Sequence, residues 1–273
     1  MDPRAGRPAT LAAAEPPAPP VGRPSFGETL HRLKSAQKPA GRGAPAYSRF
    51  VNRRLGRVLA AACHVLGLTP NQVTLVSATC TTVALALLVA LPAGTGVGIA
   101  VAVLLALGYA FDSADGQVAR LRGGGSPAGE WLDHVVDSFK EPAVHLAVLV
   151  AWYRWFDLPD HRLLLAPVLF SLLATGAFFA TWITDVLRRA HAVGPPAHAA
   201  AGAAGALRSL AVIPTDYGVL ILSFVLLGLP AAFVTVYTAL AAFTVLFLLA
   251  ALPKWFREVS AFGGPRPVPA GGR

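Results

Sequence analysis

Six apolar stretches, separated by short polar segments, dominate the pattern of hydrophobic and polar positions along the chain. Each stretch is about 20 residues long, the length that a helix needs to cross the hydrocarbon core of a bilayer. They lie at about 72–91, 95–114, 133–153, 163–187, 210–228 and 230–252. Turn-forming residues such as Pro92, Gly94 and Pro230 fall between them. The pattern predicts an all-α polytopic membrane protein with six transmembrane helices.

A helix of another kind is predicted before the first span. Between Tyr47 and Leu66, apolar residues recur at helical spacing while arginines occupy other positions. Such an amphipathic helix is expected to lie along the membrane surface, with its arginines at anionic headgroups and its apolar stripe at the acyl boundary. Packing of the apolar stripe against the protein itself is the alternative.

The pattern divides the chain into four segments. Residues 1–44 are rich in Pro, Ala, Gly and Arg and contain no long apolar run, so they are predicted to form a disordered cytosolic tail. Residues 45–68 form the amphipathic juxtamembrane helix, 69–255 the six-helix transmembrane domain, and 256–273 a flexible cytosolic tail. The apolar run at 11–14 is too short for a signal peptide, so no cleaved signal is expected.

Composition supports the membrane class. Hydrophobic residues make up 55% of the chain and charged residues 14%, at a mean hydropathy of +0.56, whereas a soluble domain carries about 25% charged residues. A plain soluble enzyme is therefore excluded. The two cysteines, Cys63 and Cys80, have no histidine at metal-ligand spacing, so neither a disulfide framework nor a zinc site is expected.

The net charge of +9 predicts an orientation rather than a nucleic-acid partner. With the N-terminus in the cytosol, 20 of the 23 Lys and Arg residues fall in cytosolic tails and loops, and two fall outside. The positive-inside rule strongly favours that arrangement, with both termini on the cytosolic side of a membrane that we take to be a bacterial plasma membrane.

Four acidic residues gather at the junction of the second and third predicted spans. They are Asp112, Asp115, Asp133 and Asp137. Ionisable groups at membrane depth are costly and are functional candidates by default. Each pair is spaced by three or four residues, so each projects from one helical face. Because a short glycine-rich turn joins the two helices, the acidic faces can oppose each other at the cytosolic interface.

Four carboxylates in a small volume need compensation, and one or two hard divalent cations would provide it. Gly116 directly follows an acid and leaves room for close approach, and Arg120 lies one turn further along, where it can bind a phosphate. Gly129 would open the facing helix in the same way. The segment is therefore suited to a nucleotide or pyrophosphate held between the two helices.

Residues 112–120 (DSADGQVAR) and 129–137 (GEWLDHVVD) together resemble the signature of the CDP-alcohol phosphotransferase, or CDP-alcohol phosphatidyltransferase, family. All eight fixed positions of that signature are matched, and residues 69–74 (TPNQVT) are similar to the segment before the family's first span. The resemblance covers roughly residues 47–252. From the residues alone, Thr69 can also cap a helix whose first residue is Pro70.

The resemblance implies transfer of the substituted phosphoryl group of a CDP-alcohol, most simply CDP-diacylglycerol, to the hydroxyl of a small polar acceptor, with release of CMP. It also implies two divalent ions, Mg²⁺ or Mn²⁺, and a homodimer. The implied metal ligands are Asp112, Asp115, Asp133 and Asp137, with Asp137 also a candidate general base. The implied CDP contacts are Gly116, Ala119, Arg120, Gly129, Asn71 and Thr74.

The acceptor site is less specified. Basic residues near the cytosolic helix ends could bind an acceptor phosphate, as in inositol phosphate or glycerol phosphate, and one acid could contact the acceptor hydroxyl. These candidates are Lys140, Arg188, Arg189, Arg208 and Asp216. Structural alternatives exist for several of them: an ion pair of Lys140 with Glu141, membrane anchoring by the two adjacent arginines, and helix capping by Asp216.

Three competing functions remain open at this point. A transferase could use a non-lipid CDP-alcohol donor in the same cytosolic cleft. An ion- or proton-coupled transporter would also use intramembrane acids, although it predicts acids spread across the bilayer rather than gathered at one depth. A structural membrane protein could use the acids to bind a stabilising ion, without any nucleotide.

Overall fold

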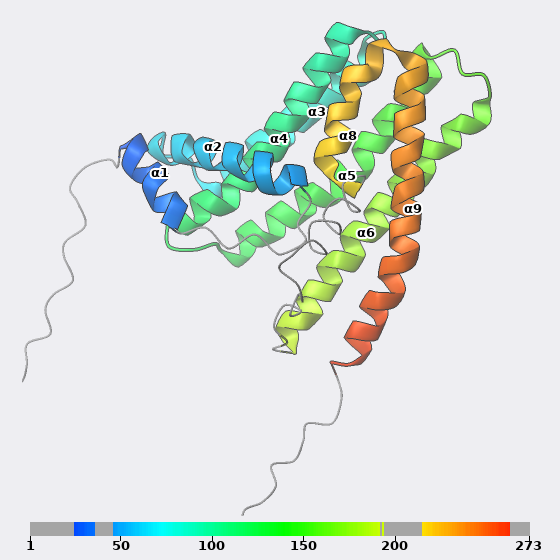
Figure 1. Ribbon diagram of the computed structural model, residues 1–273. Helices are drawn as coiled ribbons and strands as arrows, with labels where there is room; N and C mark the ends of the chain where they lie inside the picture. The colour runs from blue at the N-terminus through cyan, green and yellow to red at the C-terminus, as the bar shows by residue number, and fades with distance from the viewer. Residues whose placement is uncertain (1–24, 36–45, 192, 194–214, 263–273) are drawn as a thin grey trace, which may run out of the picture.

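The computed structural model describes residues 25–35, 46–191, 193 and 215–262, and every regular element in this part of the chain is helical. The all-α class is confirmed for these residues (Figure 1). The elements are α1 (Phe26–Ser35), η1 (Ser48–Asn52), α2 (Arg53–Val65), α3 (Pro70–Ala90), α4 (Thr95–Leu121), α5 (Pro127–Trp155), η2 (His161–Leu164), α6 (Leu165–Ala190), α8 (Tyr217–Ser223), η4 (Phe224–Gly228) and α9 (Pro230–Ser260).

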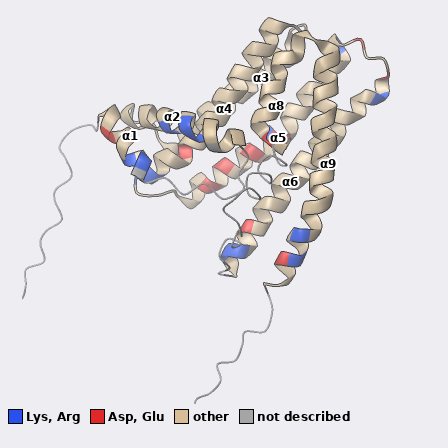
Figure 2. Ribbon diagram, in the orientation of Figure 1, with Lys and Arg blue, Asp and Glu red and all other residues tan. Residues whose placement is uncertain are grey.

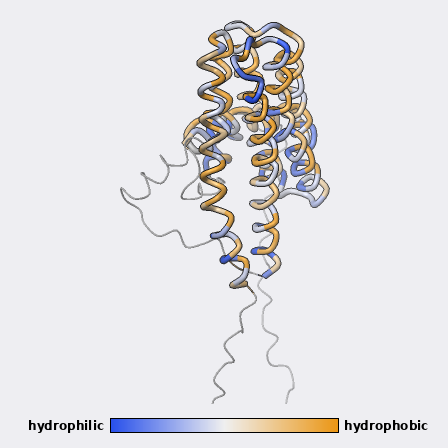
Figure 3. Tube along the Cα trace, turned by 90° about the vertical axis from the view of Figure 1, so that its right-hand side faces the viewer, coloured by the Kyte–Doolittle hydropathy of each residue, from blue (hydrophilic) through white to orange (hydrophobic). Residues whose placement is uncertain are grey.

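Four helical segments of the described chain are long and apolar enough to cross a membrane. They are Pro70–Ala90, Thr95–Leu121, His161–Ala190 and Pro230–Ser260. Apolar residues run along most of the length of these helices in Figure 3. Helix α5 covers the predicted third span, and α8 with η4 covers residues 217–228 of the predicted fifth. The count of six spans stays a prediction.

Local sequence signals set where the helices begin. Thr69 accepts a hydrogen bond from the Gln72 backbone N–H, and the Gln72 side chain accepts one from the Thr69 N–H at 2.8 Å, which forms a capping box before α3. Pro70 is the first residue of that helix, as predicted. Helix α5 begins the same way, with the Ser126 hydroxyl accepting from the Gly129 N–H at 3.0 Å.

The helices are longer than the apolar runs from which they were predicted. Helix α4 continues to Leu121 instead of ending near residue 114, and α5 begins at Pro127 instead of residue 133. The hydropathy signal ends where polar residues begin, whereas the helical backbone hydrogen bonds continue through those polar residues. All four central acids therefore lie within helices, which fixes the direction of their side chains.

Helix α2 lies within the range of the predicted amphipathic helix, and it runs at a steep angle to the vertical α9 in Figure 1. Its buried residues include Ala60, Ala61 and Cys63, which form a small apolar cluster with Val73 and Val118 of α3 and α4. The apolar stripe thus packs partly on the protein itself, while Leu55 and Val58 stay exposed. Its place at a membrane surface stays a prediction.

Helix α1 differs from the disordered tail expected for residues 1–44. Ser25 and Glu28 hydrogen-bond each other at the helix start, and Leu33 is buried in the cluster that α2 forms. A short amphipathic helix of ten residues carries little hydropathy signal, so the composition of residues 1–44 did not indicate it. Likewise, α9 extends to Ser260, five residues into the predicted C-terminal tail. Residues 1–24, 36–44 and 263–273 lie outside the described residues.

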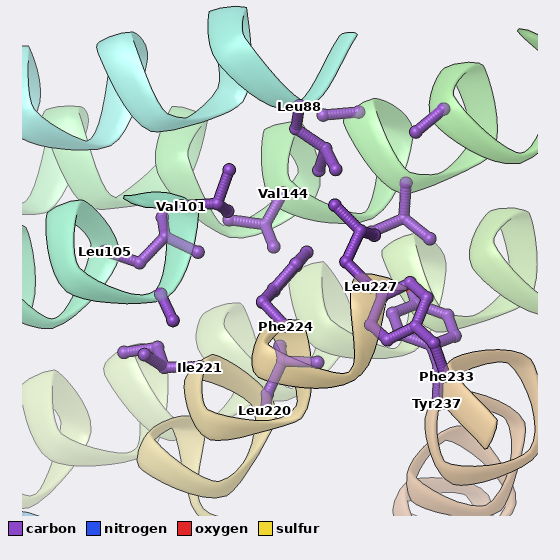
Figure 4. Close-up of a cluster of buried hydrophobic side chains, with 14 of the residues drawn as sticks. Leu88, Val101, Leu105, Val144, Leu220, Ile221, Phe224, Leu227, Phe233 and Tyr237 are labelled. Atoms are coloured by element: carbon purple, nitrogen blue, oxygen red, sulfur yellow. The ribbon is translucent and has the colours of Figure 1, made fainter. Parts of the chain in front are cut away.

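The main core is formed by residues of α3, α4, α5, α6, α8, η4 and α9, and Figure 4 shows part of it. Trp152, Phe224, Phe233 and Tyr237 are all 0% exposed. The Tyr237 hydroxyl lies 2.7 Å from His145 Nδ1, so the two buried polar groups satisfy each other. His145 is thus part of the core, to which α4 and α5 both contribute residues.

Candidate active site

Three carboxylates meet where α4 faces α5. Asp112 lies on α4, and Asp133 and Asp137 lie one turn apart on α5. One oxygen of each lies within 4.8 Å of the others. The acidic segments of these two helices also lie close together in Figure 2. The opposition of acidic faces predicted from the spacing therefore occurs for these three residues.

Lys140 partly neutralises this group. Its ammonium nitrogen lies 2.6 Å from Asp112 Oδ1 and 2.7 Å from Asp137 Oδ1, and it donates a third hydrogen bond to Ser77 Oγ at 3.2 Å. Ser77 is fully buried on α3. The ion pairs of Lys140 are with Asp112 on α4 and with Asp137 one turn earlier on its own helix, rather than with Glu141.

Asp115 stands apart from the group of three. It is 6% exposed, and its Oδ2 accepts a hydrogen bond from the Thr74 hydroxyl at 2.6 Å. Its Oδ1 accepts from the Gly116 N–H at 2.5 Å. Thr74, expected to face the nucleotide, thus holds Asp115 in this structure. A role of Asp115 as a metal ligand stays a prediction.

The site fits a hard divalent cation. Asp133 Oδ1 is buried and has no hydrogen-bond partner among the described residues. An unpaired buried carboxylate oxygen is costly unless a cation binds it. Carboxylate oxygens are also the ligands that Mg²⁺ and Mn²⁺ prefer. Asp112, Asp133 and Asp137 are the residues that could hold such an ion.

The glycines expected at the nucleotide site lie beside polar groups. A Cβ atom placed on Gly116 would lie 3.6 Å from Arg120 Nη1, so this guanidinium lies over the bare backbone of α4. A Cβ on Gly129 would lie 3.2 Å from Asn71 Oδ1. Asn71 lies on α3 and Gly129 on α5, so the packing of these two helices brings two predicted CDP contacts together. Ala119 is buried on α4, and its carbonyl accepts from Gly124 N–H at 3.0 Å.

The arginines considered for the acceptor are engaged in ion pairs. Arg188 Nη2 lies 2.8 Å from Glu258 Oε1 of α9, and its Nη1 lies 2.6 Å from Asp185 Oδ1. Arg189 Nη1 lies 2.6 Å from Glu130 Oε1 at the start of α5. Arg208 lies outside the described residues. Acceptor binding by these side chains stays a prediction.

Asp216 caps α8 and ties it to the N-terminal part of the chain. Its Oδ1 accepts from the Gly218 N–H at 3.0 Å, and its Oδ2 accepts from the Tyr47 N–H at 2.8 Å. The Tyr47 ring lies against Gly218, where no Cβ atom would fit. Burial, followed by the nearby Asp216 carboxylate, raises the pKa of the Tyr47 phenol, so the ring stays neutral. The capping alternative for Asp216 is therefore realised, whether or not Asp216 also contacts an acceptor.

Sequence reasoning missed Ser77 as a site residue. It follows Thr74 by three positions and so shares its helical face, which is the signal that could have identified it. Its hydroxyl donates to the Gly108 carbonyl at 2.8 Å while accepting from Lys140. Helix α3 thus contacts the site through two hydroxyl groups: Thr74 binds Asp115, and Ser77 binds Lys140.

A comparison with protein families now identifies the chain. The family model described as CDP-alcohol phosphatidyltransferase matches residues 67–255. The chain belongs to the CDP-alcohol phosphatidyltransferase family. The resemblance noted from residues 112–120 and 129–137 is thereby confirmed, and with it the assignment to a family of transferases that are integral membrane proteins.

Two curated relatives within this family are phosphatidylinositol phosphate synthases. The protein from Mycobacterium marinum is 30% identical over 126 residues, which is 46% of this chain and 51% of the relative. The protein from Corynebacterium glutamicum is 42% identical over 111 residues, which is 40% of this chain and 48% of the relative. The match thus spans about half the length of the curated relatives.

Solved structures of Mycobacterium tuberculosis phosphatidylinositol phosphate synthase are also similar to this family member. The complex with manganese and citrate is 20% identical at a TM-score of 0.47, over 78% of this chain and 94% of that one. The structure with CDP-DAG bound is 22% identical at a TM-score of 0.46, over 80% of this chain and 99% of that one. The apo form is 26% identical at a TM-score of 0.47, over 76% and 99% of the two chains.

Proposed function

We propose that this protein transfers the substituted phosphoryl group of CDP-diacylglycerol to the hydroxyl of a small polar acceptor, forming a phosphodiester and releasing CMP. The observation that carries the proposal is the group of Asp112, Asp133 and Asp137 at the junction of α4 and α5. The family assignment supports the reaction class. The curated relatives are phosphatidylinositol phosphate synthases, which makes inositol phosphate the first acceptor to test and glycerol phosphate the second.

The three carboxylates would hold Mg²⁺ or Mn²⁺, which supplies charge neutralisation at the transferring phosphoryl group and the departing CMP oxygen. Arg120, above the bare backbone of Gly116, binds the diphosphate. Asn71 lies beside Gly129 and contacts the nucleotide at the facing helix. With Thr74 and Ala119 shaping the floor between them, these residues hold the CDP group in line with the acceptor.

Asp137 takes the proton from the acceptor hydroxyl. Its Oδ1 is bound by Lys140, which leaves Oδ2 to accept that proton. General base catalysis requires that this carboxylate reach the acceptor hydroxyl while the hydroxyl attacks the phosphoryl group. Lys140, Arg188, Arg189, Arg208 and Asp216 remain the acceptor-site candidates.

We further propose that both termini and the active site face the cytosol, because 20 of the 23 basic residues then lie on that side. A cytosolic site gives the soluble nucleotide access while the acyl chains of the donor stay in the bilayer. A homodimer is expected from the family resemblance, and cross-linking in native membranes would test it.

The test is CMP release by the purified full-length protein with Mg²⁺ or Mn²⁺ and CDP-diacylglycerol. Inositol phosphate, glycerol phosphate, inositol, serine and no acceptor are compared. Acceptor-dependent CMP release that EDTA abolishes is the expected result, and it names the acceptor. No release with any acceptor, while CDP still binds in a metal-dependent way, would overturn the lipid donor and favour a non-lipid CDP-alcohol. Loss of CDP binding as well would overturn the transferase and reopen the transporter and structural functions.

A further inference from the structure

Further polar side chains lie one helical turn from the carboxylates of the candidate active site, on the side away from the turn that joins α4 and α5. Tyr109 lies three positions before Asp112 on α4. Glu141 lies four positions after Asp137 on α5. The ring of Tyr109 packs edge-on against that of Tyr217, the first residue of α8, with centroids 5.1 Å apart. Three helices thus contribute polar side chains next to the acidic group.

The side chain of Glu141 is directed toward the inside of the protein. Phe139, two residues earlier on α5, is 72% exposed, and two residues turn an α-helix by about 200°. Glu141 therefore lies on the opposite face of α5. Its carboxylate is close enough to Lys140 and Asp112 to interact with them electrostatically, and the phenol of Tyr217 interacts with Glu141 in the same way. The Glu141 carboxylate and the Tyr217 hydroxyl thus lie near each other, beside the acidic group.

Neither of these two polar groups is used within the described chain. No hydrogen bond joins the Glu141 carboxylate or the Tyr217 hydroxyl to another described residue. Both residues are only partly buried, and the enclosed oxygens that lack a partner in the described chain belong to other side chains. The oxygens of Glu141 and Tyr217 therefore border space that a ligand can reach. An acid in an apolar helix is costly and is a functional candidate by default.

The two groups match the hydrogen-bonding pattern of an alcohol. A carboxylate only accepts hydrogen bonds, whereas a phenol donates as well as accepts. One hydroxyl group can therefore donate to Glu141 and accept from Tyr217 at the same time. An ammonium group could also donate to Glu141, but the Lys140 ammonium in the same site would repel it. The pair is thus better suited to a neutral hydroxyl than to an amine.

We propose that Glu141 and Tyr217 bind a hydroxyl group of the acceptor that does not react, so that the acceptor is a polyol with at least one hydroxyl besides the attacking one. The inference rests on the proposed function and specifies its acceptor side. Asp137, which takes the proton from the attacking hydroxyl, is one turn from Glu141, about 5.4 Å along the helix axis. A single small polyol spans that distance and can contact both carboxylates.

The experiment measures KM values in CMP release by the purified full-length protein, with whichever of inositol phosphate and glycerol phosphate the unaltered protein uses. Glu141→Met removes both acceptor oxygens at similar volume, and Tyr217→Phe removes only a hydroxyl. Each should raise the KM for the acceptor at least about tenfold, while the KM for CDP-diacylglycerol and the affinity for Mn²⁺ stay within about twofold. Tyr153→Phe makes the same change on a side chain that is 75% exposed and should alter none of these values.

The sign of the Glu141 effect separates a contact from a field effect. If Glu141 acted only through its negative charge, its removal would lower the KM for a phosphorylated acceptor, because like charges repel. A higher KM with unchanged donor KM and Mn²⁺ affinity therefore requires contact with the acceptor.

The remaining outcomes separate the inference from the proposed function. An unchanged or lower acceptor KM in both variants would overturn the inference, and a rise in only one variant would overturn the role of the other residue. If Glu141→Met does not fold, Tyr217→Phe decides, because it keeps the ring that packs against Tyr109. No acceptor-dependent CMP release by the unaltered protein would overturn the proposed function, and the inference with it.

Discussion

Helices α4 and α5 are packed differently at their two ends. Toward Leu105 and Trp152 they contribute to a core in which aromatic rings fill the space, with Trp152 and Tyr237 centroids 5.2 Å apart. At the other end, one ammonium holds two carboxylates together and a third keeps a buried oxygen without a partner in the described chain. Such an oxygen costs about 1–3 kcal/mol of stability. The comparison indicates that packing at one end supports unfavourable charge at the other, where an ion can bind.

The largest expected effect comes from removing a charge at the acidic end. Asp133→Asn should lower the rate of CMP release by at least about 10³-fold, because an oxygen ligand of the ion is replaced by an amide. The midpoint of thermal unfolding without metal should stay equal or rise, since the unpaired charge is gone. Asp157→Asn, at an exposed loop position, is the matched control and should keep full activity. Normal activity of Asp133→Asn would contradict the metal site.

At the aromatic end of α4 and α5, a substitution should lower stability and leave the affinity for the metal ion unchanged. Trp152→Ala should lower the free energy of unfolding by about 3–5 kcal/mol, because it opens a cavity among fully packed rings. Protein that remains folded should keep its affinity for Mn²⁺, measured on the monodisperse fraction at low temperature. Trp131→Ala removes a side chain that is 66% exposed and should change stability by less than about 0.5 kcal/mol. Equal losses in the two variants would mean that the core is not the source of stability.

A smaller effect is expected where α8 meets the N-terminal part of the chain. Asp216→Ala removes the helix cap and the acceptor for the Tyr47 N–H, so stability should fall by about 1–2 kcal/mol. Asp216→Asn keeps a capping oxygen and should lose less. If Asp216 also contacts the acceptor, as proposed, the KM for the acceptor should rise in Asp216→Ala. A KM within about twofold of the unaltered value would leave Asp216 with its capping role alone.

The smallest stability effect is expected at the exposed pair of Arg189 and Glu130. Arg189→Met and Glu130→Gln should each change the free energy of unfolding by about 0.5 kcal/mol or less, because both side chains are more than half exposed. Steady-state kinetics distinguishes the roles of the two residues. If Arg189 binds an acceptor phosphate as proposed, the KM for a phosphorylated acceptor rises in Arg189→Met and not in Glu130→Gln. An equal KM in both variants would mean that Arg189 forms the ion pair but does not bind the acceptor.

The sequence predicted the parts of the fold and site that depend on local spacing. The helical class, the cap at Thr69 and the meeting of Asp112 with Asp133 and Asp137 follow from periodicities of three and four residues. The partners of Lys140 and Asp216 could not be predicted this way. Ser77 precedes Lys140 by 63 positions and Tyr47 precedes Asp216 by 169, so these contacts depend on how helices pack rather than on neighbouring residues. Helices α4 and α5 extend beyond the predicted spans because hydropathy reports the bilayer and not the backbone ladder.

The hydrogen bond between Tyr47 and Asp216 has a consequence for the order in which parts of the protein fold during synthesis. Tyr47 leaves the ribosome long before Asp216, yet its N–H donates to that carboxylate and its ring rests on Gly218. The segment that begins at Tyr47 cannot complete its docking until nearly four-fifths of the polypeptide has been synthesised. During translation, this contact can therefore form only after the start of α8 has been synthesised, whereas α2 can already pack on α3 and α4.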